Sequence, residues 1–255
     1  MTRSDDHTTA AAARTARGEA FDILRTVGAA LLLATAFRIL AWQPFTIPSS
    51  SMEPGLVTGD YIVVSKFAYG WSGASLPFGP WPGGERLFGR GPDRGEVVVF
   101  RDSRQRGKTL IKRVIGVPGD RVQVRDGAVL VNGAAIARQA IGPRTDRDDP
   151  NLTPMVVVET AADGRRWETF DRGVGPGDDT EVFVVPEGRY FMMGDNRDNS
   201  LDSRWPAGVG VGFVDEADIV GRADLILASW DKGTSLLKPW TWLTLNPGRV
   251  LKPVR

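Results

Sequence analysis

Ser51 is a candidate catalytic nucleophile, because it lies in the run PSSSMEP, a few residues beyond the single long apolar stretch of the chain. A serine hydroxyl needs a neighbouring base before it can attack a carbonyl group. The chain offers no suitable imidazole, since the only histidine is His7 in the polar N-terminal tail, and it contains no cysteine. Among the known variants of serine catalysis, a lysine is then the leading choice for the base.

Six lysines are available for that role: Lys66, Lys108, Lys112, Lys232, Lys238 and Lys252. A lysine that acts as a general base must be neutral, so burial has to lower its pKa from about 10.4 toward 7 or 8. The polar loop around Lys108 and the Gly/Pro-punctuated tail exclude four of them. Lys66 ends its apolar run, whereas Lys112 interrupts TLIKRVIGV and shares one strand face with Leu110 and Val114. The pattern favours Lys112, and a solvated or salt-bridged role for it is an equal alternative.

The segment before Ser51 is predicted to be a transmembrane helix over residues 25–43. It is apolar from about Val27 to Trp42, apart from one threonine and Arg38. About 20 helical residues cross a bilayer core, so the segment is marginally long enough with its flanks. Arg38 lies in its last third, where a long basic side chain can reach the interface.

The charges around this segment predict its orientation. Three arginines precede it and no basic residue follows until Lys66, so residues 1–24 are expected to be a cytoplasmic tail and residues 44–255 an extracytoplasmic domain. A cleaved signal peptide, with the Ala-Thr-Ala run at 34–36 as its cleavage site, and a buried core helix are the two alternatives.

Residues 44–255 are predicted to form a mainly β domain, because short β-branched runs alternate with Gly, Pro and Asp. Asp126-Gly127 and Asp163-Gly164 predict hairpin turns. No long amphipathic helix is expected. The predicted strands are 61–65, 96–101, 110–117, 121–125, 128–132, 155–160, 166–170, 181–185, 190–193 and 218–227.

Two further features are open to more than one interpretation. Gly- and Pro-rich stretches at 142–151 and 171–180 are expected to be loops of a variable β insert over about 133–185. The aromatic segment 68–84 and the tail around Trp240 and Trp242 either cover the core or contact the bilayer interface.

The composition excludes several classes of function. A chain of 255 residues with a formal net charge of +1 suggests no polyanionic partner, so nucleic-acid binding is disfavoured. The absence of cysteine rules out disulfides, thiol catalysis and Cys-based zinc sites. No metal and no cofactor is expected.

Three segments together resemble the bacterial type I signal peptidases, which are membrane-anchored Ser/Lys proteases. They are IPSSSMEPGLVTGDYIVVSK at 47–66, RGEVVVF with IKRVIGVPGDRV at 94–100 and 111–122, and MGDNRDNSLDSR at 193–204. The resemblance implies the β-fold of that family behind one transmembrane helix, in the bacterial cell membrane. It also implies cleavage of signal peptides from exported preproteins after Ala-x-Ala, without cofactor or metal.

The same resemblance assigns roles to individual residues. It makes Ser51 the nucleophile and Lys112 its general base, with Ser49 as a side-chain donor to the oxyanion. Ser200 would orient the lysine ammonium. The supporting ion pair would be Asp202 with Arg204, and Asp195 and Arg197 would lie nearby. The substrate pockets would be lined by Phe45, Ile47, Met52, Leu56, Leu110 and Ile111.

Two residues depart from the pattern of the family. Gly55 stands where many members carry threonine, and Glu53 adds a charge beside the nucleophile. Two other functions remain alternatives. A repressor-type Ser/Lys autoprotease would carry an N-terminal DNA-binding domain in place of the apolar helix. A membrane-tethered binding module without catalysis would keep its function after Ser51→Ala.

Overall fold

The computed structural model describes residues 5–75, 86, 88–102, 108–231, 234 and 239–255. It divides into two compact units, residues Met1–Ala41 and Trp42–Arg255, which are considered separately below.

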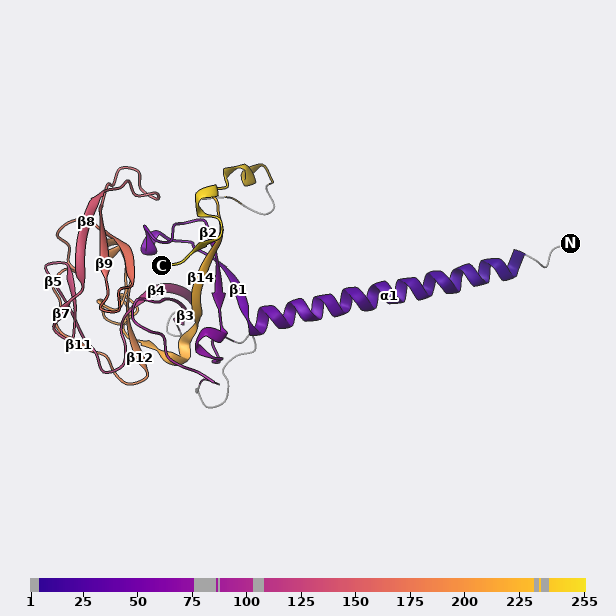
Figure 1. The fold of residues 1–255 in the computed structure, drawn as a ribbon, viewed down its shortest axis with the longest axis horizontal. Coiled ribbons are helices and arrows are strands. Elements are labelled where there is room, and N and C mark those ends of the chain that lie inside the picture. The colour runs from indigo at the N-terminus through magenta and orange to yellow at the C-terminus, as the bar shows by residue number, and fades with distance from the viewer. Residues whose placement is uncertain (1–4, 76–85, 87, 103–107, 232–233, 235–238) are drawn as a thin grey trace. The chain divides into compact units, whose positions relative to one another are not determined.

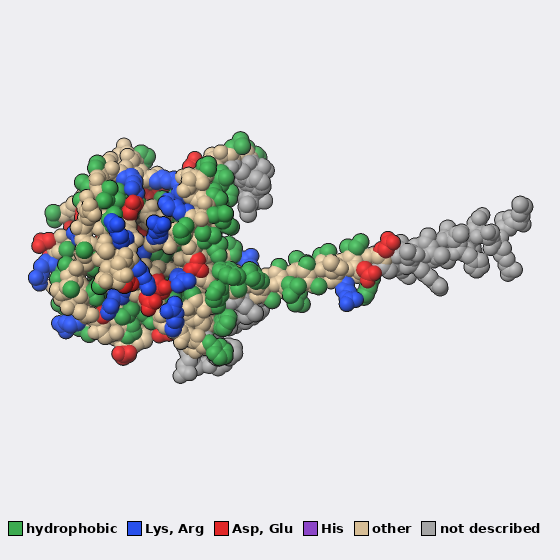
Figure 2. Space-filling view, viewed as in Figure 1, with side chains coloured by type: hydrophobic (Ala, Val, Ile, Leu, Met, Phe, Trp, Pro, Cys, Tyr) green, Lys and Arg blue, Asp and Glu red, His purple; other side chains and the backbone are tan. Residues whose placement is uncertain are grey.

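The N-terminal unit is one long helix, α1 (Asp5–Leu40). It starts well before the predicted segment, because the alanine-rich run at 9–13 favours helix, and it ends before the predicted residue 43. Its described apolar side chains are largely exposed, and several of them are visible along the helix in Figure 2. Within the described part of the chain, no helix holds a stretch both long and apolar enough to span a bilayer.

The C-terminal unit is built around a twisted antiparallel sheet of eight strands (Figure 1). Its order is β1-β2-β14-β3-β4-β12-β13, and β15 pairs with β14. The bounds are β1 Trp42–Thr46, β2 Asp60–Ser65, β3 Val97–Asp102, β4 Lys108–Gly116, β12 Arg189–Met193, β13 Val214–Asp215, β14 Ile219–Ser229 and β15 Lys252–Pro253.

Two smaller antiparallel sheets and several short 3₁₀ helices complete this unit. One sheet has the order β10-β9-β8, with β8 Ala137–Pro143, β9 Met155–Thr160 and β10 Arg166–Asp171. The other has the order β11-β5-β6-β7, with β5 Arg121–Arg125, β6 Ala128–Val131, β7 Ala134–Ala135 and β11 Phe183–Val184. The 3₁₀ helices are η1 Ser50–Met52, η2 Phe67–Tyr69, η4 Arg197–Asn199, η5 Glu216–Asp218, η6 Pro239–Thr244 and η7 Pro247–Arg249.

The mainly β prediction is confirmed, and each predicted strand is present within a few residues. The turn at Asp126 and Gly127 is confirmed as well, with φ of 48° and 69°, the left-handed geometry of a tight hairpin. Two longer strands were missed. β1 contains Pro44, which is tolerated because β1 is an edge strand. β8 carries mostly exposed side chains and has no β-branched run.

Strand β4 lies where three clusters of buried side chains meet. Ile111 belongs to the first cluster, Leu110 and Val114 pack with the second, and Ile115 belongs to the third. Apolar side chains therefore surround Lys112 along its own strand.

The aromatic segments are described only in part. Residues 76–85, which include Phe78 and Trp81, lie outside the described residues, as does the side chain of Trp242. Trp240 is exposed on η6, so it does not cover the core.

Candidate active site

The structure brings Ser51 and Lys112 into direct contact. Ser51 lies on the 3₁₀ helix η1, and Lys112 lies in the middle of β4. The Lys112 Nζ donates a hydrogen bond to the Ser51 Oγ at 2.7 Å. Residues 61 positions apart thus form a nucleophile and base pair at hydrogen-bond distance.

The environment of Lys112 makes its neutral form more accessible than that of an ordinary lysine. Burial lowers the pKa of Lys112 to about 8, and the negative charges of Asp202 and Asp195 offset this only in part. Lys66 is buried to the same degree, at 4% exposure against 5% for Lys112. Contact with Ser51, and not burial, therefore distinguishes the two lysines. A neutral amine at this position can accept the Ser51 proton, which is the step that activates a serine for acyl transfer.

The turn that carries Ser51 is held by the segment after β12. The backbone N–H of Asn196 donates to the Ser51 carbonyl at 3.2 Å, and its side-chain amide donates to the Ser50 carbonyl at 3.1 Å. The Asn199 amide donates to the Ser50 Oγ at 2.8 Å. Sequence reasoning quoted this motif and gave neither asparagine a role; their position beside a candidate catalytic serine was the available signal.

Gly194 allows the close approach of these two segments. A Cβ there would lie 2.4 Å from the Ser51 carbonyl oxygen and 2.4 Å from the Ser200 Oγ. Any side chain at this position would separate the turn from the segment that supports it.

Three ion pairs are buried behind the turn. Arg204 pairs with Asp202 at 2.9 Å, Arg113 with Asp195 at 2.6 Å, and Arg197 with Glu159 at 2.5 Å. Burial by itself would raise the pKa of Asp202, but the Arg204 guanidinium and the Gly194 N–H more than offset this and lower it.

Two of these partners were missed by the sequence analysis. Asp195 and Arg197 follow β12 near the site, as the resemblance implied, but they pair with Arg113 on β4 and Glu159 on β9. Arg113 was overlooked although it directly follows Lys112. Glu159 was overlooked although it is a charged residue inside the apolar run VVVET.

Ser49 and Ser200 lie on either side of the pair. Ser49 is exposed and immediately precedes η1. Ser200 is buried, and its Oγ makes no hydrogen bond to any part of the chain that the structure describes. The bond from Ser200 to Lys112 that the resemblance implied is therefore not formed in this structure.

Two cavities adjoin Lys112. The smaller, of about 290 Å³, is lined by Ser49 and Ser51 and by four of the six predicted pocket residues, Phe45, Ile47, Leu110 and Ile111. The other two, Met52 and Leu56, are buried in the first core cluster at 0% and 1% exposure and do not line it. Their apolar character reflects packing beneath the turn.

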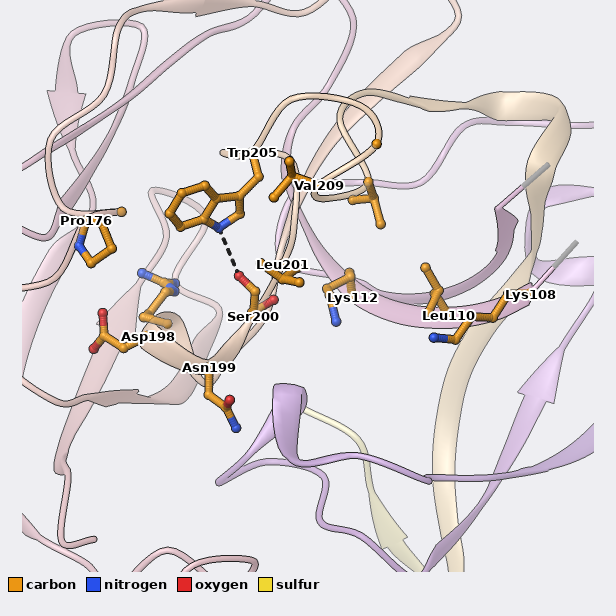
Figure 3. A pocket seen from close by; sticks show the side chains of 14 residues that line it. Lys108, Leu110, Lys112, Pro176, Asp198, Asn199, Ser200, Leu201, Trp205 and Val209 are labelled. Carbon is orange, nitrogen blue, oxygen red and sulfur yellow. Dashed lines mark hydrogen bonds between the residues drawn. The ribbon is translucent and has the colours of Figure 1, made fainter. Parts of the chain in front are cut away.

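The larger cavity, of about 520 Å³, lies beside Ser200 (Figure 3). Lys108 and Leu110 lie at one end of it, Lys112 and Ser200 in the middle, and Asp198 and Pro176 at the other end. Among the described residues, no group of three or more His, Cys, Asp or Glu side chains is placed to hold a metal ion.

Comparison with known proteins gives one consistent family. The model of the family "Signal peptidase, peptidase S26" matches residues 20–230. The signal peptidase I of Rickettsia prowazekii is 37% identical over 232 residues, which cover 82% of this chain and 85% of that protein. That of Rickettsia akari is 36% identical over 233 residues, covering 82% and 84%. A solved signal peptidase I from Enterococcus faecalis V583 matches at 28% identity, with 52% of this chain and 97% of that chain covered and a TM-score of 0.32.

Proposed function

Because the chain belongs to the signal peptidase family, peptidase S26, we propose that it is a membrane-anchored enzyme that removes signal peptides by means of a Ser51–Lys112 dyad. Its family makes it a serine endopeptidase. The observation that supports the dyad is the 2.7 Å contact between a buried amine and the Ser51 hydroxyl.

The geometry supports a complete catalytic cycle. Neutral Lys112 takes the proton of Ser51, and the Ser51 Oγ attacks the scissile carbonyl. The Ser49 hydroxyl and the Ser51 backbone N–H stabilise the tetrahedral oxyanion. Lys112 then protonates the leaving amine, and the same lysine activates the water that hydrolyses the acyl-enzyme.

The smaller cavity is the proposed site for the signal-peptide side of the substrate. It adjoins both Ser49 and Ser51, and its apolar walls come from Phe45, Ile47 and Ile111. Such a cavity suits small apolar side chains, in keeping with cleavage after Ala-x-Ala.

The helix α1 is the proposed anchor. Its described apolar side chains are exposed around the whole circumference, which favours a surrounding apolar medium. Arginines precede the apolar part, whose own Arg38 falls in the last helical turn. This distribution supports a cytoplasmic N-terminus and a catalytic unit on the outer side of the bacterial membrane.

The test is cleavage of an Ala-x-Ala peptide by the purified full chain in detergent. Ser51→Ala and Lys112→Ala are each expected to lower kcat by about 10³-fold or more, because each removes a member of the dyad. Lys252→Ala, which removes an exposed lysine on β15, should cleave like the unmodified chain. Cleavage that survives either dyad substitution would contradict the mechanism and would favour a tethered binding module.

A further inference from the structure

The larger cavity beside the dyad has no role in the mechanism so far. It shares Lys108, Leu110 and Lys112 with the smaller cavity and continues past Ser200 to Asp198 and Pro176 (Figure 3). Neither Ser49 nor Ser51 lines it. Beyond the three shared residues, the smaller cavity therefore continues along Ser49 and Ser51, and the larger one continues along Ser200.

The direction of the reaction distinguishes the two cavities. When Ser51 acylates, the signal-peptide portion stays attached to its Oγ, whereas the amine of the mature portion leaves with a proton from Lys112. The leaving amine must therefore lie within hydrogen-bond reach of the Lys112 Nζ. An extended peptide advances about 3.3 Å per residue, so the next mature residues must enter space that begins at Lys112 and lies outside the smaller cavity.

The far end of the larger cavity is bordered by a fixed loop of the insert. Asp198 accepts a hydrogen bond from the backbone N–H of Arg172 at 2.7 Å, which ties this loop to η4. Asp178 accepts one from the Gly175 N–H at 2.6 Å within the loop. Pro176 is thereby held against the segment that carries Ser200.

Part of the lining is apolar. The Trp205 indole N–H donates to the Ser200 carbonyl at 3.2 Å, which fixes the ring over the cavity (Figure 3). Leu201 and Val209 are 59% and 56% exposed although they line the same cavity. Exposed apolar side chains along a cavity next to a reacting group are suited to contact with a bound chain.

We propose that this cavity binds the first residues of the mature portion of the substrate, on the leaving-group side of the cut. The inference rests on the proposed function and adds a substrate subsite to it. The loop at 172–178 and the side chains of Trp205 and Val209 then contribute to the choice of cleavage site. Binding energy from residues beyond the cut is used to position the scissile bond.

The test compares two peptides that share one Ala-x-Ala signal portion. The short peptide ends one residue after the cut, and the long peptide continues for five residues. For the unmodified chain, kcat/KM for the long peptide should exceed that for the short one by about tenfold or more. In Trp205→Ala and Val209→Ala this ratio should fall toward one.

Two control variants separate this subsite from other effects. Ile111→Ala, in the smaller cavity, should lower kcat/KM for both peptides and keep their ratio. Val182→Ala, exposed and outside the cavity, should change neither value. The exposed position of Val209 makes its substitution compatible with folding.

Three results would overturn the subsite. One is a long-to-short ratio near one in the unmodified chain. Another is a ratio that Trp205→Ala and Val209→Ala leave unchanged. The third needs a second pair of peptides that differ only at the residue two positions before the cut: if the effect of Val209→Ala depends on that residue, the cavity binds the signal portion instead. If the unmodified chain cleaves neither peptide, the proposed function fails, and the subsite fails with it.

Discussion

The two faces of strand β4 each carry one buried basic side chain, and the two side chains have different partners. Lys112 and Arg113 are consecutive, so their side chains point to opposite faces, and both are buried, at 5% and 1% exposure. Arg113 donates two hydrogen bonds to Asp195 and lies 4.9 Å from the Trp167 ring. Lys112 contacts the Ser51 hydroxyl, and no carboxylate in the described part of the chain forms an ion pair with it.

The difference shows how one strand can supply both a structural ion pair and a proposed catalytic base. The paired Arg113 guanidinium fixes the segment that follows β12, because its desolvation is offset by two charge-assisted hydrogen bonds to Asp195. Burial removes water from around the Lys112 ammonium, and no ion pair with a described residue replaces it. The charged form is therefore destabilised, and the pKa of Lys112 falls to about 8. The first arrangement contributes rigidity and the second contributes a base.

The largest expected effect comes from removing the buried ion pair between Arg113 and Asp195. Arg113→Met leaves the Asp195 carboxylate buried without its partner and should lower the free energy of unfolding by about 3 to 5 kcal/mol. Urea unfolding of the full chain, followed by tryptophan fluorescence, measures this.

The exposed pair between Arg189 and Asp215, at 2.7 Å, is the matched control for that variant. Arg189→Met should cost less than about 1 kcal/mol. Equal losses in Arg113→Met and Arg189→Met would show that burial of the Arg113 pair has no special weight.

A smaller effect is expected at Glu53, a buried carboxyl group that directly follows η1. Burial is the main cause that raises the pKa of Glu53 to about 7; the neighbouring Asp146 and Asp148 contribute to the rise, and a backbone hydrogen bond from Arg147 opposes it. The unfolded chain releases this proton near 4.5 and the folded chain only near 7. Its contribution to stability is therefore complete below pH 4.5 and is lost as the pH rises through 7.

Glu53→Gln should abolish that loss. The variant should be more stable than the unmodified chain by about 2 to 3 kcal/mol at pH 8 and equally stable at pH 4, because the amide carries no charge at either pH. Urea unfolding at the two pH values measures the difference, with exposed Glu187→Gln as the control. A gain of the same size at pH 4 would show that charge is not the cause.

The lowered pKa of Lys112 should make the rate of cleavage depend on pH. Only neutral Lys112 can accept the Ser51 proton, so kcat should rise with pH to a plateau with an apparent pKa of about 8. Between pH 6 and pH 8 this amounts to an increase of about fifty-fold. Lys252→Ala should keep the same profile. A flat profile from pH 6 to 8 would contradict a titrating base at Lys112.

The sequence offered a local signal for Lys112 and none for the partner of Arg113. Lys112 could be singled out as a candidate base because it is a lysine inside an apolar run, in a chain that has one histidine and no cysteine. The partner of Arg113 could not be predicted, because Asp195 is 82 residues away and the contact depends on how β4 and β12 pair. The same limit applies to Glu53 and Asp146, which only the folded insert brings together.

The smallest expected effect on stability concerns Ser200, whose buried hydroxyl lies beside the cavity next to Lys112. Its Oγ is buried and makes no hydrogen bond to the described residues, so Ser200→Ala removes an unsatisfied polar group and should change the free energy of unfolding by less than about 1 kcal/mol. If the hydroxyl orients Lys112 once substrate is bound, kcat should still fall, by about tenfold or more, with KM little changed. Ser200→Thr, which keeps a hydroxyl, should recover part of that rate. Normal kcat in Ser200→Ala would leave the orientation of Lys112 to the packing of Leu110 and Val114 along its own strand.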